Sequence, residues 1–243
     1  SPQTGITAAD FLDYDNDNYE PAKGGKLNGT GADLSVAFTD DITGYTRTIP
    51  WDIGAYAAKS TPVTHTLRAE GLGGDYTLMS AWEAGEQRDL VDLDETETLE
   101  CYDDWPSGLN NKAAIGGWTT SQNNTITIRA AEGQGHNGVI GQGFKMTTAV
   151  VTSNVIEVSN AYVTVSGITL IATASAGIKR GIYTTSTSNF CLFKDLIVSA
   201  VSTGSAGYGI VDVSAFNGGA THINCVAYDC TTSGFLTSIS RSS

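Results

Sequence analysis

The chain has 243 residues, of which 40% are apolar, and 26 acidic against 13 basic side chains give it a formal net charge of −13. This charge repels nucleic-acid phosphates and anionic membrane surfaces, and no apolar run approaches the roughly 20 residues of a membrane span, so we expect neither partner. Charged residues make up only 16%, whereas Gly, Ser, Thr and Asn are abundant and few stretches have the period of an amphipathic helix. The composition therefore predicts a mainly β structure.

The first acidic pattern is DYDNDN, near the start of the sequence. Asp13, Asp15 and Asp17 stand at alternating positions, as they do at the start of a calcium-binding loop. Asn18 stands where an EF-hand has glycine, and Gly24 stands where it has a bidentate glutamate, so the segment is not an EF-hand. Two alternatives remain, a looser calcium site built from the three carboxylates and an acidic, solvated loop. Calcium is the only cofactor that the sequence suggests.

Residues 40–56, DDITGYTRTIPWDIGAY, have the character of the end of a domain although they lie near the start of the sequence. They combine an acidic turn, a glycine, an arginine and a short apolar stretch. A linker is expected over residues 57–72, and the main unit over residues 73–243. The sequence thus predicts an unusual order, in which a closing segment over residues 1–56 precedes the main unit.

After the linker the sequence predicts one short helix and then one or two strands. LMSAWEAGEQRDL places Leu78, Trp82 and Leu90 on one helical face, but Gly85 limits the helix to one or two turns. DLVDLDETETLECYDDW, residues 89–105, interleaves apolar and acidic residues, which is typical of strands with a polar outer face.

An internal repeat dominates the C-terminal half. Three segments superpose, VTVSGITL, CLFKDLIV and THINCVAY, which begin at Val163, Cys191 and Thr221. Residues at equivalent positions of the three segments are expected to stack on one another, and we call each such set a column. The three predicted columns are Val165, Phe193 and Ile223; Ile168, Leu196 and Val226; and Leu170, Val198 and Tyr228. A second apolar series has nearly the same spacing and comprises Ile156, Ile182, Ile210 and Phe235. Short β segments with such a period bury their apolar faces by stacking as successive coils with parallel pairing.

This repeat resembles the right-handed parallel β-helix superfamily, the pectate-lyase-like fold, over about residues 120–243. NNTITIRAAEGQGHNGVI, which begins at Asn123, is similar to an entering coil. The resemblance implies an all-β chain folded as a right-handed parallel β-helix. It says little about function, because the superfamily includes polysaccharide lyases and hydrolases, viral tail spikes, adhesins and inert surface proteins.

The opening segment is similar to the segment that closes β-helix domains in extracellular and phage-encoded proteins. The residues that match this closing motif are Asp41, Gly44, Arg47, Asp52, Gly54 and Tyr56, whereas Ala57 departs from the acidic residue often found next. The resemblance implies that the end of one β-helix unit is followed by a second unit, as in a tandem array.

Candidate catalytic residues are few, and none is assigned. His136 in GQGHNG is similar to the Gly-His-Gly signature of polygalacturonase-like hydrolases, but the companion Asn-Thr-Asp and paired-Asp signatures are missing, so we expect a turn histidine. Lys179 and Arg180 precede a predicted strand, where they form either a lyase-type base and carboxylate clamp or an ordinary charged loop. The carboxylates considered for a glycosidase pair are Asp103, Asp104, Asp195, Asp212 and Asp229.

The four cysteines, Cys101, Cys191, Cys225 and Cys230, have neither metal-site spacing nor that of a disulfide framework. We expect free thiols that pack as small apolar side chains, with Cys191 in a column with Val163 and Thr221. A bridge between Cys225 and Cys230 is the alternative.

The interpretation that accounts for most of these features is a structural or adhesive module of an extracellular or virion appendage, such as a tail spike, tail fibre or surface filament. The last coil leaves an unpaired parallel edge, so the expected partners are sister subunits in a homo-oligomer or head-to-tail filament. Glycans are a further expected partner, stacked on Tyr183 and Tyr208. The alternative is a polysaccharide lyase or glycoside hydrolase of the pectate-lyase-like fold.

Overall fold

The computed structural model describes residues 5–23, 25–37, 39–47, 51–57, 59–149, 153–213 and 219–237. The chain divides into two compact units, unit 1 (Ser1–Ser60) and unit 2 (Thr61–Ser243). Unit 2 therefore begins at Thr61 rather than near Gly73. The segment predicted as a linker contains a strand, β3 (Thr61–Leu67), which pairs along its whole length with β4 (Glu95–Cys101).

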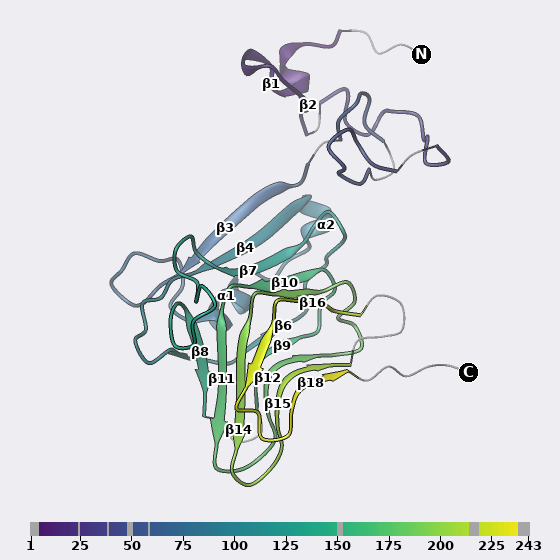
Figure 1. Ribbon diagram of the computed structural model, residues 1–243. Helices are drawn as coiled ribbons and strands as arrows, with labels where there is room; N and C mark the ends of the chain where they lie inside the picture. Colours follow the sequence, from purple (N-terminus) through teal and green to yellow (C-terminus); the bar gives the residue numbers. More distant parts are fainter. Residues whose placement is uncertain are drawn as a thin grey trace, which may run out of the picture. The chain divides into compact units, whose positions relative to one another are not determined.

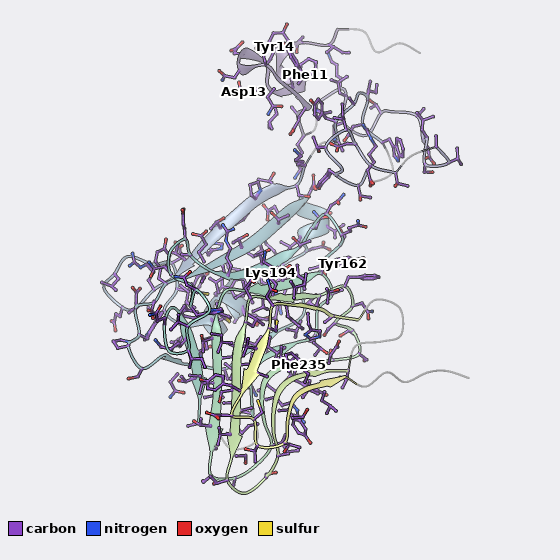
Figure 2. All side chains as sticks on the ribbon, viewed as in Figure 1. Phe11, Asp13, Tyr14, Tyr162, Lys194 and Phe235 are labelled. Carbon is purple, nitrogen blue, oxygen red and sulfur yellow. The ribbon has the colours of Figure 1, made fainter. Side chains whose placement is uncertain are left out.

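Unit 1 contains little regular structure. Its elements are η1 (Ala8–Asp10), β1 (Phe11–Asp13), η2 (Tyr14–Asn16) and β2 (Asn18–Pro21), and β1 pairs antiparallel with β2. The rings of Phe11, Tyr14 and Tyr19 lie 5.7 to 5.8 Å apart and hold this hairpin together. Figure 2 labels Phe11, Asp13 and Tyr14 at this hairpin.

Unit 2 is built from three parallel sheets (Figure 1). The first sheet contains β3, β4, β7 (Ile126–Ala130), β10 (Val163–Ser166), β13 (Leu192–Lys194) and β16 (Thr221–Ile223). The second contains β5 (Leu109–Asn110), β8 (Lys145–Thr148), β11 (Thr169–Ala174), β14 (Ile197–Ser202) and β17 (Val226–Tyr228). The third contains β6 (Ala113–Ile115), β9 (Ser153–Val158), β12 (Lys179–Thr184), β15 (Gly207–Asp212) and β18 (Ser233–Thr237).

The chain visits the three sheets in turn, so each strand pairs with the strand of the same sheet in the preceding or following pass. We call one such pass, for example β10 to β12, a coil. The mainly β character and the parallel pairing agree with the prediction, and the arrangement is compatible with a β-helix-like or solenoid fold. Each coil completes the hydrogen bonding of its neighbour.

The second apolar series forms one column in the third sheet, as predicted. Ile182 pairs with Ile156 on one side and Ile210 on the other, and Ile210 pairs with Phe235. The three isoleucines are at most 1% exposed. Burial of each such side chain contributes about 1.5 to 3 kcal/mol, so the column is a main source of the stability of unit 2.

In the first sheet the predicted pairing of Val165 with Phe193 is confirmed, but the last coil is shifted by one residue. His222, not Ile223, pairs with Phe193, and their ring centroids lie 5.5 Å apart. Successive residues of a strand face opposite sides, so the one-residue shift places Ile223 on the outer face, where it is 46% exposed. The prediction was wrong because it assumed that an apolar residue fills every inward position.

The same shift continues into the second sheet. The pairing of Leu170 with Val198 is as predicted, but Val198 pairs next with Ala227 rather than Tyr228. Val226 pairs with Ile197 and is 52% exposed. The last coil therefore presents apolar side chains on its outer face.

The shifted register predicts unequal effects for two isoleucine truncations. Ile210→Ala should lower the free energy of unfolding by about 2 to 5 kcal/mol, because it opens a cavity in the buried column. Ile223→Ala should change it by less than about 0.5 kcal/mol, because the side chain stands on the outer face. Urea titration followed by far-ultraviolet circular dichroism measures both values. A large cost for Ile223→Ala would contradict the shifted register and favour the predicted pairing of Ile223 with Phe193.

The short helix predicted around Trp82 is present as α1 (Met79–Glu86), in the coil between β3 and β4. Met79 and Trp82 are fully buried and join the core of unit 2, where the Trp82 ring lies 5.7 Å from that of Trp118. Leu78 precedes the helix and is 40% exposed, so it does not share the buried face as predicted. The helix covers the apolar interior at the end of unit 2 where the second and third sheets begin.

The acidic segment over residues 89–105 forms one strand, β4, which follows a single turn of helix, α2 (Leu90–Leu93). Asp89 caps α2, since its carboxylate accepts the backbone N–H groups of Val91 and Asp92. Because the capped residues form α2, the strand begins at Glu95 and not at the start of the segment.

Candidate functional site

The structure brings together the two tyrosines predicted to contact glycans. Tyr183 lies in β12 and Tyr208 in β15, and both side chains are partly exposed. Arg180 pairs across the strands with Tyr208, and its guanidinium carbon lies 4.7 Å from the centroid of the Tyr183 ring. Arg180 thus links the two aromatic residues, a contact that sequence spacing alone does not reveal.

Two polar residues of β9 complete this surface. The Asn154 Oδ1 accepts a hydrogen bond of 3.2 Å from Arg180 Nη1, and the Asn154 amide donates to Glu157 Oε2 at 2.9 Å. Glu157 pairs across the strands with Tyr183. We call these five residues the tyrosine face. It offers aromatic rings beside fixed hydrogen-bonding groups, which suits a ligand with both apolar and hydroxyl surfaces.

Lys179, the other candidate from GIKRG, lies on the opposite side of the same strand. The two residues are the first of β12, not a loop before it, so alternation places Arg180 outside and Lys179 inside. Lys179 is fully buried, and within the described part of the chain its Nζ has no hydrogen-bond partner. Burial lowers the pKa of Lys179 below its ordinary value. Lys179 and Arg180 therefore do not form a joint base and clamp at one surface.

The buried Lys179 predicts a stabilising substitution. Lys179→Met should raise the free energy of unfolding at neutral pH by about 1 to 3 kcal/mol, because it removes an unpaired buried ammonium group. A lowered pKa in the folded state means that the unfolded chain binds this proton more tightly, so native stability rises with pH up to about 10.5. The variant should lose that rise.

Urea titrations between neutral and alkaline pH measure both effects. Lys194→Met serves as the matched control, because the Lys194 side chain is 46% exposed and its loss should change stability by less than about 0.5 kcal/mol. Destabilisation by Lys179→Met would show that the ammonium group has a stabilising partner.

His136 has the contacts of a turn histidine. The backbone N–H of Gly138 donates to its Nδ1 at 2.9 Å, so Nε2 carries the proton and donates to the Asp195 carbonyl oxygen at 2.6 Å. His136 is only 7% exposed. Nε2 thus joins the loop to a turn two coils away in the stack, and Nδ1 accepts a hydrogen bond within the loop itself.

The five aspartates considered for a glycosidase pair lie in separate surroundings. Asp104 binds Arg68 at 3.1 Å, Asp103 lies 3.7 Å from Lys145 Nζ, and Asp212 accepts from Thr184 Oγ1 at 2.7 Å. Asp195 and Asp229 occupy turns with positive φ angles. Asp195 and Asp212 also lie in different sheet regions, in agreement with the expectation that they do not pair.

The three carboxylates of the calcium hypothesis lie at the hairpin of unit 1. Asp13 accepts a hydrogen bond from Asn16 at 2.8 Å, and Asp17 accepts one from the Tyr19 hydroxyl at 2.8 Å. A search of the described residues finds no group of three or more His, Cys, Asp or Glu side chains placed to hold a metal ion. The calcium hypothesis therefore rests on the sequence pattern alone.

The residues of the predicted closing motif form a polar framework in unit 1. Asp41 Oδ1 accepts the backbone N–H groups of Thr43 and Tyr45, and its Oδ2 accepts that of Ala57 at 3.1 Å. Arg47 Nη2 donates to the Gly54 carbonyl oxygen at 2.7 Å. These hydrogen bonds join the two ends of residues 41–57, so the matched Asp41 and Arg47 stabilise the local fold of this segment.

Two further matched residues extend this framework. Asp52 accepts hydrogen bonds from the Asn28 amide at 2.8 Å and from the Gly29 backbone at 2.6 Å. Gly44 has a φ of 81°, a conformation that favours glycine. Tyr56, the last matched residue, is partly exposed.

The Asp41 framework predicts that acid destabilises unit 1. Burial alone would raise the pKa of Asp41, but the hydrogen bonds from Thr43, Ala57 and Tyr45 outweigh it and lower the pKa to about 2. The stabilisation is complete above the unfolded-state pKa near 4 and is lost as the pH falls towards 2, with a total of about 2 kcal/mol.

Asp41→Asn should remove most of this acid dependence while keeping the side-chain shape. Hydrogen exchange of the Thr43, Tyr45 and Ala57 amides, followed by NMR between about pH 5 and 2, tests this prediction. Equal pH dependence in the variant and the native protein would contradict it.

All four cysteines are free thiols. Cys101 and Cys191 are buried, and burial raises the pKa of both thiols, that of Cys191 to about 11. Cys225 and Cys230 are partly buried and form no bridge, so the alternative of a disulfide is not supported. Thr221 pairs with Leu192, so it does not share the column of Cys191 as predicted.

Sequence reasoning missed a buried ionic cluster centred on Glu97. This carboxylate is fully buried and accepts hydrogen bonds from Trp82 Nε1 at 3.0 Å and Arg88 Nη2 at 2.8 Å. It also contacts His65 Nδ1 at 2.8 Å, while His65 Nε2 lies 3.3 Å from Glu86. The cluster joins α1 to β3 and β4. The signal was present in the alternation of ETETLEC, which places Glu97 on the same side as Leu99 and Cys101.

No family model matches the sequence, and no curated protein or solved structure is detectably similar to the chain. Among the described residues, the helices are too short and too polar to cross a membrane.

Proposed function

We propose that the chain is a structural or adhesive module of an extracellular or virion appendage, that unit 2 is a right-handed parallel β-helix, and that the module assembles end to end with sister subunits. The observation that carries the proposal is the exposed apolar edge formed by the last described strands of the three sheets. Unit 1, whose framework follows the closing motif of β-helix domains, supports a place in a tandem or repeated assembly.

Within the described residues, β16, β17 and β18 each pair with a single neighbouring strand. Phe235 continues the buried isoleucine column yet is 44% exposed, and Figure 2 shows it on β18 at the end of the third sheet. A parallel edge beside exposed apolar side chains favours pairing with another β edge, and we propose that a sister subunit supplies it.

The tyrosine face supplies the adhesive part of the proposal. Tyr183 and Tyr208 stand on the outer face of the third sheet, on adjacent strands that lie about 4.8 Å apart. The flat arrangement suits an extended glycan that lies across several strands. Arg180 and Glu157 provide hydrogen-bonding groups for its hydroxyls, and the buried Asn154 holds both side chains in place.

Sedimentation velocity over a range of protein concentrations tests the assembly. The native chain should form larger species as concentration rises, and Phe235→Lys should remain monomeric because it places a charge at the open edge. Leu72→Lys makes the same change at a side chain that is 49% exposed on the loop after β3, and it should assemble like the native chain. A native chain that is monomeric at every concentration, or equal loss in both variants, would overturn end-to-end assembly.

Incubation with neutral and acidic polysaccharides tests the non-enzymatic part. A structural module should release neither reducing ends nor unsaturated sugars. Turnover that disappears on replacement of Arg180 or one of the five aspartates would instead establish the lyase or hydrolase alternative.

A further inference from the structure

One connection between the first and second sheets is much longer than the others. The connections from β10 to β11, from β13 to β14 and from β16 to β17 each contain two residues, which begin with Gly167, Asp195 and Asn224. The connection from β7 to β8 spans residues 131–144. We call it the long loop. Insertions of this kind on a regular scaffold commonly carry binding functions.

The long loop is tied to the later coils at His136, although residues 137–142 are exposed to solvent. His136 at its centre donates a hydrogen bond to the Asp195 carbonyl oxygen, which spans 59 positions of sequence. At the base of the loop, a Cβ on Gly143 would lie 2.3 Å from the Gly135 carbonyl carbon, so the two loop segments touch. The loop therefore forms a stable wall beside the column of turns.

A cavity of about 410 Å³ lies between this wall and the turns. The loop contributes Gly135, His136, Asn137 and Gly138, and the turns contribute Gly167, Asp195 and Asn224. The volume falls within the range of small-molecule binding sites. Because three of its lining residues are glycines, a ligand ring can approach the backbone closely.

The polar side chains of the cavity are short, and two of them are hydrogen-bonded to each other. Asp195 and Asn224 occupy equivalent turns of successive coils, with φ angles of 52° and 51°, and the Asn224 amide donates to Asp195 Oδ1 at 3.2 Å. Lys194 Nζ lies 4.0 Å from Asp195 Oδ2, and both side chains are nearly half exposed, so this ion pair is weak. Asp195 retains acceptor capacity, and the amides of Asn137 and Asn224 offer both donors and acceptors.

The chemistry of the lining selects among ligand classes. The residues that form the cavity include no Lys or Arg, and Asp195 repels anions. They include no aliphatic or aromatic hydrocarbon side chain that would hold an apolar ligand. One carboxylate supplies too few oxygens for a calcium ion. An uncharged ligand with several adjacent hydroxyl groups matches what remains.

We infer that the long loop and the turns at Asp195 and Asn224 form a binding site for a neutral sugar ring. Asp195 accepts hydrogen bonds from two neighbouring hydroxyls, the amides of Asn137 and Asn224 pair with the next hydroxyls, and the glycines contact the face of the ring. His136 acts as a positioning residue through its bond to Asp195. The site is separate from the tyrosine face and does not depend on end-to-end assembly.

Titration of the ¹⁵N-labelled full chain with glucose, galactose, mannose and xylose tests the inference by NMR. At least one sugar should shift the amide signals of Gly135, Gly167 and Asn224, with a dissociation constant of about 1 to 10 mM for a single ring. Glucuronate, which carries a carboxylate, should bind at least about tenfold more weakly than glucose.

Asp195→Gly is the decisive variant, because it removes the carboxylate at a positive φ where the preceding coil already has Gly167. It should weaken binding about tenfold or more, which corresponds to loss of one strong hydrogen-bonding group. Asp229→Gly makes the same change at another exposed turn residue, with a φ of 47°, and should leave binding unchanged. Thermal unfolding of both variants checks that they remain folded.

Three results would overturn the inference. The first is that none of the four sugars shifts these amides. The second is equal binding by Asp195→Gly and the native chain. The third is binding that is lost in Tyr208→Ala but retained in Asp195→Gly, since that result would place the sugar on the tyrosine face.

Discussion

Glu97→Ala should lower the free energy of unfolding of unit 2 by about 3 to 5 kcal/mol, the cost of removing one partner from a buried ionic cluster. The substitution leaves the Arg88 guanidinium and the Trp82 indole N–H without the acceptor that they share in the native protein. It also removes the fully buried carboxylate that contacts His65 Nδ1. The cluster connects α1 to two strands, so its loss should loosen the end of unit 2 that the helix covers.

Glu100→Ala is the matched control for Glu97→Ala. Glu100 lies on the same strand with its carboxylate on the outer face, where it binds Arg129 at 2.7 Å, and the Arg129 side chain is 51% exposed. Exposed ion pairs contribute little, so the expected cost is below about 1 kcal/mol. Urea titration with tryptophan fluorescence measures both. Similar costs for the two variants would mean that Glu97 is solvated in solution.

Phe193→Ala should cost about 3 to 5 kcal/mol, because it leaves a large cavity in the buried face of the first sheet, one strand from its C-terminal edge. Phe193 is fully buried, pairs with Val165 on one side and contacts the His222 ring on the other. The same deletion exposes His222 to the cavity. Both effects reduce the stability of the last coil more than that of the earlier ones.

Phe190 provides the matched control for Phe193. It is 53% exposed and stacks on Tyr162 with the ring centroids 5.2 Å apart. Phe190→Ala removes that stack but opens no cavity, so the expected cost is below about 1 kcal/mol. Differential scanning calorimetry separates the two cases. A Phe190 variant as unstable as the Phe193 variant would contradict the assignment of inner and outer faces.

The parallel coils were predictable because their signal is repeated along the chain. Ile156, Ile182 and Ile210 recur with nearly equal spacing, and each marks the same inward position of the third sheet. Tyr183 and Tyr208 were chosen as aromatic residues on predicted turns, but the structure places both within strands, β12 and β15. Stacking turns a weak local pattern into a strong one, because several coils have to satisfy the same register.

The errors lie where polar residues face inward. His222 occupies an inward position in the last coil, and the search for apolar columns chose Ile223 instead. Glu97 likewise stands in a column with Val63 and Ile126, where polarity alone suggested an outer face. Such residues are inside because they have specific partners, and those partners are distant in sequence.

The cavity beside the long loop could not be predicted from local sequence. It depends on His136 reaching Asp195, and on coil stacking that brings Asp195 next to Asn224. The glycines and Asn137 looked like ordinary loop residues. Only the three-dimensional stacking shows that they line a common space with the turns of later coils.

Hydrogen exchange of the β18 amides, resolved by NMR, tests most directly whether the open sheet edge is the assembly surface. In a parallel sheet the N–H groups of a strand point alternately to its two sides, so alternate amides of Ser233–Thr237 should exchange rapidly in dilute, monomeric protein. At concentrations that favour assembly the same amides should become protected, while those bonded to β15 stay protected throughout. Full protection of β18 in the dilute monomer, or no change on assembly, would contradict the account.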